Sequence, residues 1–134
     1  MRISKIALFA VPALAAAALA LPSISSAEDE LERWQTARAI GESESCISIR
    51  QIRRTEVHDN RTIDFHMTGR RIYRNTLPSD CGSLGFEEAF SYETSLSRLC
   101  SSDIITVLQQ PISQSIPGPR CGLGRFQPIE FPES

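Results

Sequence analysis

The sequence of 134 residues contains no two cysteines closer together than 19 positions. Structural zinc sites usually pair their ligands two to four residues apart, and thiol redox centres also need a close pair. The motifs G-x-S-x-G, S-x-x-K and H-E-x-x-H are absent as well. The first two motifs contain the nucleophilic serine of common hydrolases, and the third is typical of zinc proteases. We therefore expect no metal and no cofactor. No motif in the sequence identifies a reaction.

Lysine is almost absent, and the single one, Lys5, lies in an N-terminal targeting pattern. Arg2 and Lys5 precede an apolar run over 6–21, Pro22 breaks the run, and small residues follow at 25–27. This pattern predicts a secretory signal peptide over 1–27, cleaved after about Ala27. The run is shorter than the roughly 20 residues that span a bilayer. We expect a periplasmic or secreted protein with no stable membrane insertion after cleavage.

Cleavage would leave residues 28–134, enough for one domain with a modest core. Removing Arg2 and Lys5 from the 14 basic residues leaves twelve, all arginine, against 16 acids, for a net charge of −4. We divide this part into an N-terminal helix and linker over 28–45 and a disulfide-stapled β domain over 46–134.

The predicted helix rests on apolar residues at near-helical spacing, with acidic residues at its start and Gly41 at its end. The apolar positions are Leu31, Trp34, Ala37 and Ile40.

From Cys46 onward the pattern is that of strands. Residues 46–57 alternate with a break near Arg50 and Gln51, which predicts a bulge or bend. Residues 62–67 alternate cleanly. A two-residue turn at 68–69 would then place Phe65 opposite Ile72 and Asp64 opposite Tyr73.

The second half of the chain is less regular. We predict a long loop with one short strand over 78–102, a central strand at 103–109 covered on both faces, and an irregular tail over 110–134. The tail should reach the core at Phe126 or Ile129. The fold class is therefore mainly β, with α+β possible: a small antiparallel meander or partly open barrel with one N-terminal helix.

An even number of cysteines in a short exported chain predicts two disulfides. Three pairings are possible among Cys46, Cys81, Cys100 and Cys121. If the strand at 103–109 lies beside the strand that follows Cys46, Cys81 and Cys100 share one end of the sheet. We then expect Cys81–Cys100 and Cys46–Cys121.

In the order of its segments, the chain resembles a family of small exported four-cysteine proteins of Gram-negative bacteria. That family is catalogued only as a domain of unknown function. The segments that carry the resemblance lie between residues 46 and 126: "CISI", "DNRTIDF", "RIYRNTLPSDCGSLGFEEAFSY", "LCSSDIITV" and "CGLGRF". The resemblance implies an envelope location and a shared fold, and no activity.

One candidate site is catalytic. Asp64 and His66 share a strand face and could act as an acid/base pair, and the predicted hairpin adds Tyr73. A solvated polar strand face explains the same residues without catalysis.

The other candidate site is a basic patch. Residues 50–74 hold seven arginines and three acids, a local charge of +4. Such a patch could bind an anionic envelope component or an acidic protein, whereas nucleic acid is not expected in an exported acidic chain. Pairing of these arginines with the acids of 28–44 and 87–93 is the competing interpretation. The candidate binding residues are Arg53, Arg54, Arg70, Arg71 and Arg74.

The sequence thus favours a cell-envelope binding, inhibitory or structural module that is not an enzyme. The alternative is a small periplasmic hydrolase that uses the Asp64, His66 and Tyr73 face. Catalysis predicts a concave pocket where those side chains converge, and binding predicts a flat or convex face that carries arginines.

Overall fold

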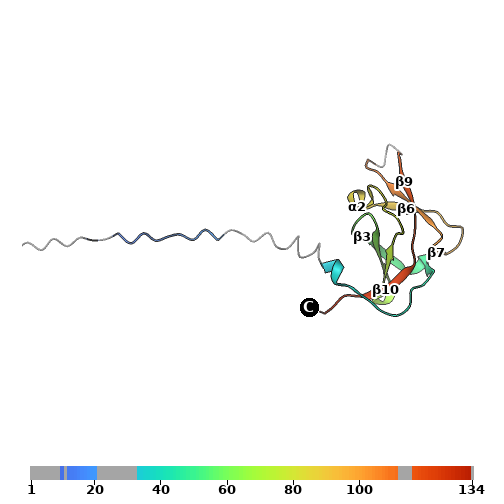
Figure 1. Ribbon diagram of the computed structural model, residues 1–134, viewed down its shortest axis with the longest axis horizontal. Coiled ribbons are helices and arrows are strands. Elements are labelled where there is room, and N and C mark those ends of the chain that lie inside the picture. The colour runs from blue at the N-terminus through green and yellow to red at the C-terminus, as the bar shows by residue number, and fades with distance from the viewer. Residues whose placement is uncertain (1–9, 11, 21–32, 112–115, 134) are drawn as a thin grey trace, which may run out of the picture.

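A computed structural model describes residues 10, 12–20, 33–111 and 116–133. Residues 12–20 are exposed, carry no helix or strand and lie outside the β domain (Figure 1). The predicted cleavage site at Ala27 is outside the described residues. Within the described ranges, no helix is long and apolar enough to cross a membrane.

The largest element is a five-stranded antiparallel sheet in the order β1-β10-β5-β4-β3. It contains β1 (Arg38–Ala39), β10 (Phe126–Glu130), β5 (Ile72–Thr76), β4 (Thr62–Met67) and β3 (Ile52–Val57).

Two smaller antiparallel sheets complete a mainly β fold. One pairs β2 (Cys46–Ser48) with β7 (Arg98–Cys100), and the other has the order β6-β8-β9. Its strands are β6 (Phe90–Tyr92), β8 (Ile104–Leu108) and β9 (Pro117–Gly122). The short helix α2 (Leu84–Glu87) contacts β8 and is labelled in Figure 1. The strand orders do not close into a barrel.

The core lies between the five-stranded sheet and the smaller sheets. Phe65 of β4 is fully buried and contacts Phe90 of β6 and Phe126 of β10, with ring centroids 6.3 Å and 5.4 Å apart. Ile105 and Val107 of β8 are also fully buried. Both tail residues expected in the core, Phe126 and Ile129, are buried.

The strand at 62–67 is confirmed, but the predicted hairpin register is wrong by one residue. Phe65 lies opposite Tyr73, and Asp64 lies opposite Arg74. The connection has three residues, Thr68–Arg70, and both Gly69 (φ 78°) and Arg70 (φ 63°) are left-handed. Such a φ is easy for glycine and uncommon for arginine, so the sequence did not signal the longer turn.

The predicted N-terminal helix is wrong beyond Thr36, and its first residues, 28–32, lie outside the described ranges. A 3-10 helix, η1, spans only Trp34–Thr36, and β1 follows at Arg38–Ala39. Backbone pairing with β10 replaces the helical turn here: Ala39 lies opposite Ile129, and Ile40 N–H donates to the Pro128 carbonyl at 2.8 Å.

The predicted bend in 46–57 is confirmed as the 3-10 turn η2 (Ile49–Gln51) between β2 and β3, followed by a register shift between Ile52 and Arg54. The loop expected over 78–102 contains α2, β6 and β7 rather than one strand. The tail is also more regular than expected, since it supplies β9 and β10, although 112–115 are not described.

Two disulfides are present, but the predicted pairing is wrong: Cys46 bonds Cys100, and Cys81 bonds Cys121. The prediction placed 103–109 beside the strand after Cys46. Instead β7 pairs with β2, which sets Cys46 opposite Cys100 with Cα atoms 4.0 Å apart. Strand β8 is central in another sheet, and only one of its faces is covered, because Ile104 is 46% exposed.

Candidate functional site

The face of the five-stranded sheet that points away from the main core carries most of the ionisable side chains. The register places Arg54 opposite His66, and Glu56 opposite Asp64. Because side chains alternate along a strand, residues two apart share this face. We call it the polar face; its members on β3, β4 and β5, with the residue that follows β3, are Arg54, Glu56, His58, Asp64, His66, Ile72 and Arg74.

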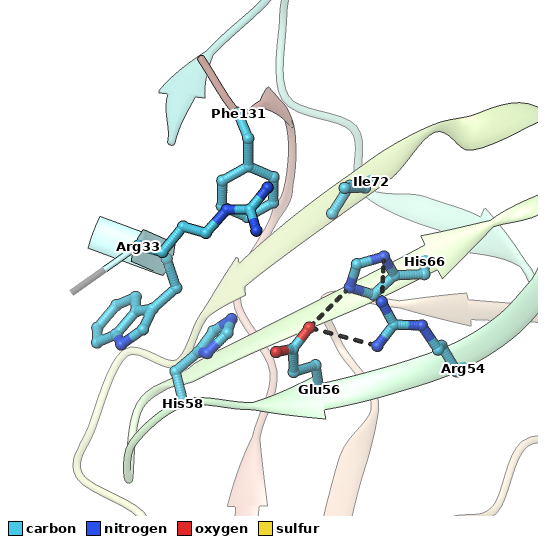
Figure 2. Close-up of a pocket in the computed structure, with 8 residues that line it drawn as sticks. Arg33, Arg54, Glu56, His58, His66, Ile72 and Phe131 are labelled. Carbon is cyan, nitrogen blue, oxygen red and sulfur yellow. Dashed lines mark hydrogen bonds and ion pairs between the residues drawn. The ribbon is translucent and has the colours of Figure 1, made fainter. Parts of the chain in front are cut away.

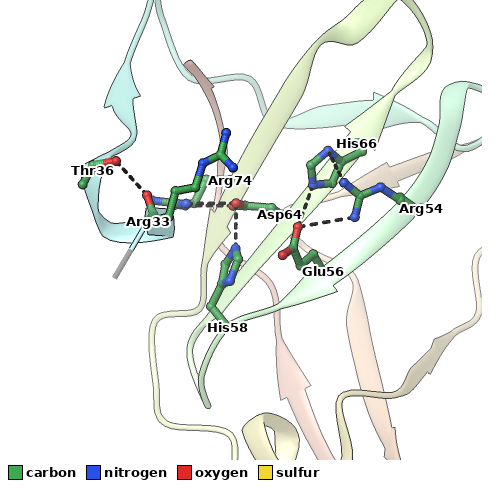
Figure 3. A network of polar contacts seen from close by, with 8 residues as sticks. All are labelled: Arg33, Thr36, Arg54, Glu56, His58, Asp64, His66 and Arg74. Atoms are coloured by element: carbon green, nitrogen blue, oxygen red, sulfur yellow. Dashed lines mark hydrogen bonds and ion pairs between the residues drawn. The ribbon is translucent and has the colours of Figure 1, made fainter. Parts of the chain in front are cut away.

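Asp64 is the centre of a buried cluster on the polar face (Figure 3). It is fully buried and accepts hydrogen bonds from Arg74 Nε (2.8 Å), Arg74 Nη2 (2.9 Å) and His58 Nε2 (2.8 Å). Burial by itself would raise the pKa of Asp64, but the hydrogen bonds and charges of Arg74 and His58 outweigh burial and hold the pKa below its ordinary value. Asp64 therefore stays ionised and is committed to these two partners.

Trp34 covers this cluster. Its ring stacks on the His58 ring, with centroids 4.8 Å apart and planes within 7°, and the Arg74 guanidinium lies 5.4 Å from the Trp34 ring centre. Stacking and cation–π attraction therefore fix η1 against the polar face. Trp34, which the sequence analysis placed in an N-terminal helix, instead forms part of the site.

A second, more exposed cluster joins Glu56, His66 and Arg54 (Figure 3). His66 Nε2 lies 3.1 Å from Glu56 Oε2, and Arg54 contacts both Glu56 Oε2 and His66 Nδ1 at 3.4 Å. Arginine can only donate, so His66 Nδ1 is the acceptor of the Arg54 contact and Nε2 is the nitrogen that faces Glu56. The Arg54 contacts are longer than a typical N–H···O bond and its side chain is 63% exposed, so Arg54 is held loosely.

The two clusters border one hollow of about 470 Å³ (Figure 2). Its walls combine basic, acidic and apolar side chains from η1, β3, β4, β5 and the residue after β10. They are Arg33, Trp34, Arg54, Glu56, His58, His66, Ile72 and Phe131. Figure 2 shows Phe131 and Arg33 at one side of the hollow, with Arg54, Glu56 and His66 at the other.

The predicted catalytic set is only partly assembled. Asp64 and His66 do share the polar face, but they have different partners: Asp64 bonds His58 and Arg74, whereas His66 bonds Glu56. Tyr73 is wrong as a member of this face, because the one-residue change in register turns it to the other side of β5, where it is 6% exposed in the core.

The predicted arginine patch is divided. Arg54 and Arg74 lie on the polar face, but Arg74 is bound to Asp64. Arg70 occupies the β4–β5 turn, Arg71 donates to Gln51 Oε1 at 3.0 Å, and Arg53 is exposed outside the hollow. Among the described residues, the ion pairs of Arg54 and Arg74 are with acids of β3 and β4 rather than with acids of 33–44 or 87–93.

Six residues of the hollow were not predicted as site residues: Arg33, Trp34, Glu56, His58, Ile72 and Phe131. Strand alternation of Arg54, Glu56 and His58 was a signal that could have placed His58 on the face. Trp34 and Phe131 reach the hollow from outside β3–β5, so no local pattern indicates them.

Within the described residues, no group of three or more His, Cys, Asp or Glu side chains could hold a metal ion. Comparisons with protein-family models, with curated proteins and with solved structures found no match.

Proposed function

We propose that this protein is an exported binding module of the bacterial cell envelope that recognises an anionic group in the hollow on its polar face. Two features support export: the signal-peptide pattern over 1–27 of the sequence, and the two disulfides of the structure, since disulfides form in oxidising compartments. The single observation that carries the binding proposal is the presence of a loosely held arginine, Arg54, in the wall of a concave site.

The charges of the site favour an anion. The hollow and the clusters that border it contain three guanidinium groups, those of Arg33, Arg54 and Arg74, and two carboxylates, those of Glu56 and Asp64. Their net charge is +1 when the histidines are left out of the sum. Since Arg74 is held on Asp64 by two short hydrogen bonds, from Nε and Nη2, Arg54 and Arg33 are the groups left to meet a ligand. Guanidinium groups suit carboxylate and phosphate oxygens because they donate two parallel hydrogen bonds.

A hydrolase remains the second candidate, favoured by the hydrogen bond between His58 and Asp64. A buried carboxylate that orients an imidazole is a common arrangement for a general base. The other ring nitrogen of His58 has no hydrogen-bond partner among the described residues, and His58 lines the hollow. Among the residues that the structure describes, no serine, threonine or cysteine lines the hollow, so the nucleophile would be water.

Capture from the native envelope tests the binding proposal. The mature protein is crosslinked in its own cells, purified and analysed for bound material, beside the variants Arg54→Gln and Arg53→Gln. Arg53 is the matched control because it is a neighbouring exposed arginine outside the hollow. Material that Arg53→Gln retains and Arg54→Gln loses supports the proposal. Equal recovery by both variants, or nothing above background, contradicts it.

The hydrolase candidate is tested separately with a panel of activated esters and the purified mature protein. His58→Gln and Asp64→Asn should abolish turnover, while His66→Gln retains it. Turnover that survives His58→Gln would exclude this candidate.

A further inference from the structure

The hollow is lined by apolar and aromatic side chains as well as by charged ones, and this combination limits the ligand. Phe131, Ile72 and Trp34 are the apolar or aromatic residues of its lining, apart from the two histidines. A fully hydrated anion such as phosphate would gain nothing from these surfaces. An anion with an apolar body could place that body against them.

Arg54 is the group best suited to receive the charged end. Its two side-chain contacts are 3.4 Å long, whereas those of Arg74 are 2.8 and 2.9 Å. Exchanging two long contacts for a short bidentate pair with a ligand carboxylate costs little and adds well-aligned hydrogen bonds. Glu56 is then left with His66, from which it already accepts a hydrogen bond at 3.1 Å.

The net charge of the site and the volume of the hollow restrict the class of ligand further. With the histidines left out of the sum, the site charge of +1 is neutralised by one carboxylate, whereas a dianion would leave an excess negative charge beside Glu56 and Asp64. A hollow of about 470 Å³ is within the usual range for small-molecule sites. It accommodates one aromatic ring with a short acid side chain.

We infer that the hollow binds a small organic monocarboxylate with a flat apolar body, its carboxylate on Arg54 and its body against Phe131, Ile72 and Trp34. This inference rests on the proposed function and names the ligand class of the same site.

The test uses phenylacetate as the probe and the indole N–H of Trp34 as the reporter, since Trp34 is the only tryptophan of the chain. The mature disulfide-bonded protein is labelled with ¹⁵N and titrated by NMR with phenylacetate, phenylacetamide and inorganic phosphate. Phenylacetamide has nearly the same shape without the charge, and phosphate has charge without the apolar body.

Saturable movement of the Trp34 resonance by phenylacetate, with at least tenfold weaker binding of phenylacetamide and of phosphate, is the expected result. Arg54→Gln should weaken phenylacetate binding at least tenfold, and Arg53→Gln should leave it within twofold. Arg54→Lys, which keeps the charge without the fork, should give an intermediate loss.

Equal binding of phenylacetate and phenylacetamide would overturn the inference, as would no response of Trp34 to phenylacetate. Phosphate binding as tight as phenylacetate binding would also overturn the inference about the ligand class. That result would still agree with the proposal that the hollow recognises an anion. The envelope capture experiment does not depend on phenylacetate, so failure of the ligand class and failure of the binding function give different results.

Discussion

Asp64 and Arg74 lie opposite each other on adjacent strands β4 and β5 and share two hydrogen bonds, of 2.8 and 2.9 Å, on a carboxylate with no exposed surface. His58 Nε2 also hydrogen-bonds Asp64, through Oδ2, the carboxylate oxygen that accepts from Arg74 Nη2. Because Trp34 stacks on His58, the buried pair also supports one wall of the hollow.

Asp64→Asn should destabilise the protein by about 3 kcal/mol at pH 7, because the variant leaves Arg74 partly buried without its counter-charge. The measurement is the free energy of unfolding in urea. Glu130→Gln is the control: it removes an exposed ion pair with Arg38 and should cost less than about 1 kcal/mol. Similar losses in both variants would contradict the central role of Asp64.

The Asp64 carboxylate should also dominate the change in folding stability at acid pH. Its folded pKa lies below the ordinary 3.8, so its contribution is fully present above the unfolded pKa and is lost as the pH falls through the folded pKa. The stability difference between wild type and Asp64→Asn should shrink as the pH falls below about 4. A difference that stays constant down to pH 2 would show that Asp64 is not held ionised by its partners.

His58→Ala should remove the stacking surface under Trp34 and one hydrogen bond to Asp64, at a cost of about 2 kcal/mol. The indole would become more accessible to water, so we expect Trp34 fluorescence to shift to longer wavelength. His66→Ala changes the same sheet face without touching this stack and should leave the emission unchanged. Identical spectra for wild type and His58→Ala would contradict the observed packing.

Tryptic digestion without reduction should identify both disulfides directly. Cleavage after arginine is expected to yield peptide 39–50 joined to 99–120, and peptide 75–98 joined to 121–125. Mass spectrometry distinguishes these from the pairs that Cys81–Cys100 and Cys46–Cys121 would produce.

Each bond closes a loop of 54 or 40 residues, so replacing either pair by serine should cost about 4 kcal/mol of stability in the loop-entropy estimate.

Gly124→Ala should be strongly destabilising, by about 1–3 kcal/mol, because an added Cβ would collide with the Thr76 carbonyl oxygen. Gly124 also exchanges two hydrogen bonds with the buried side chain of Asn75, at 2.7 and 2.8 Å, and so has little freedom to shift. Gly122→Ala is the matched control, since a Cβ there meets nothing within 4 Å. Thermal unfolding should separate the two variants clearly, and equal melting temperatures would contradict the close approach at Gly124.

Some of the candidate site was accessible from the sequence. Alternation within 62–67 put Asp64 and His66 on one face, and the basic character of 50–74 drew attention to Arg54 and Arg74. The partner of Asp64 was not accessible, because facing residues depend on the length of the β4–β5 turn. Left-handed Arg70 lengthens that turn by one residue, and a one-residue slip exchanges Tyr73 for Arg74 on the polar face.

The sequence by itself determined the mainly β class, the strand at 62–67, the bend after β2 and the formation of two disulfides. These follow from local periodicity and from cysteine number, which the chain carries without reference to distant segments. Only the tertiary structure decided that β7 pairs with β2, and hence that Cys46 bonds Cys100. It likewise decided that Trp34 and Phe131 meet the polar face, because the pairing of distant segments depends on how the whole core is buried.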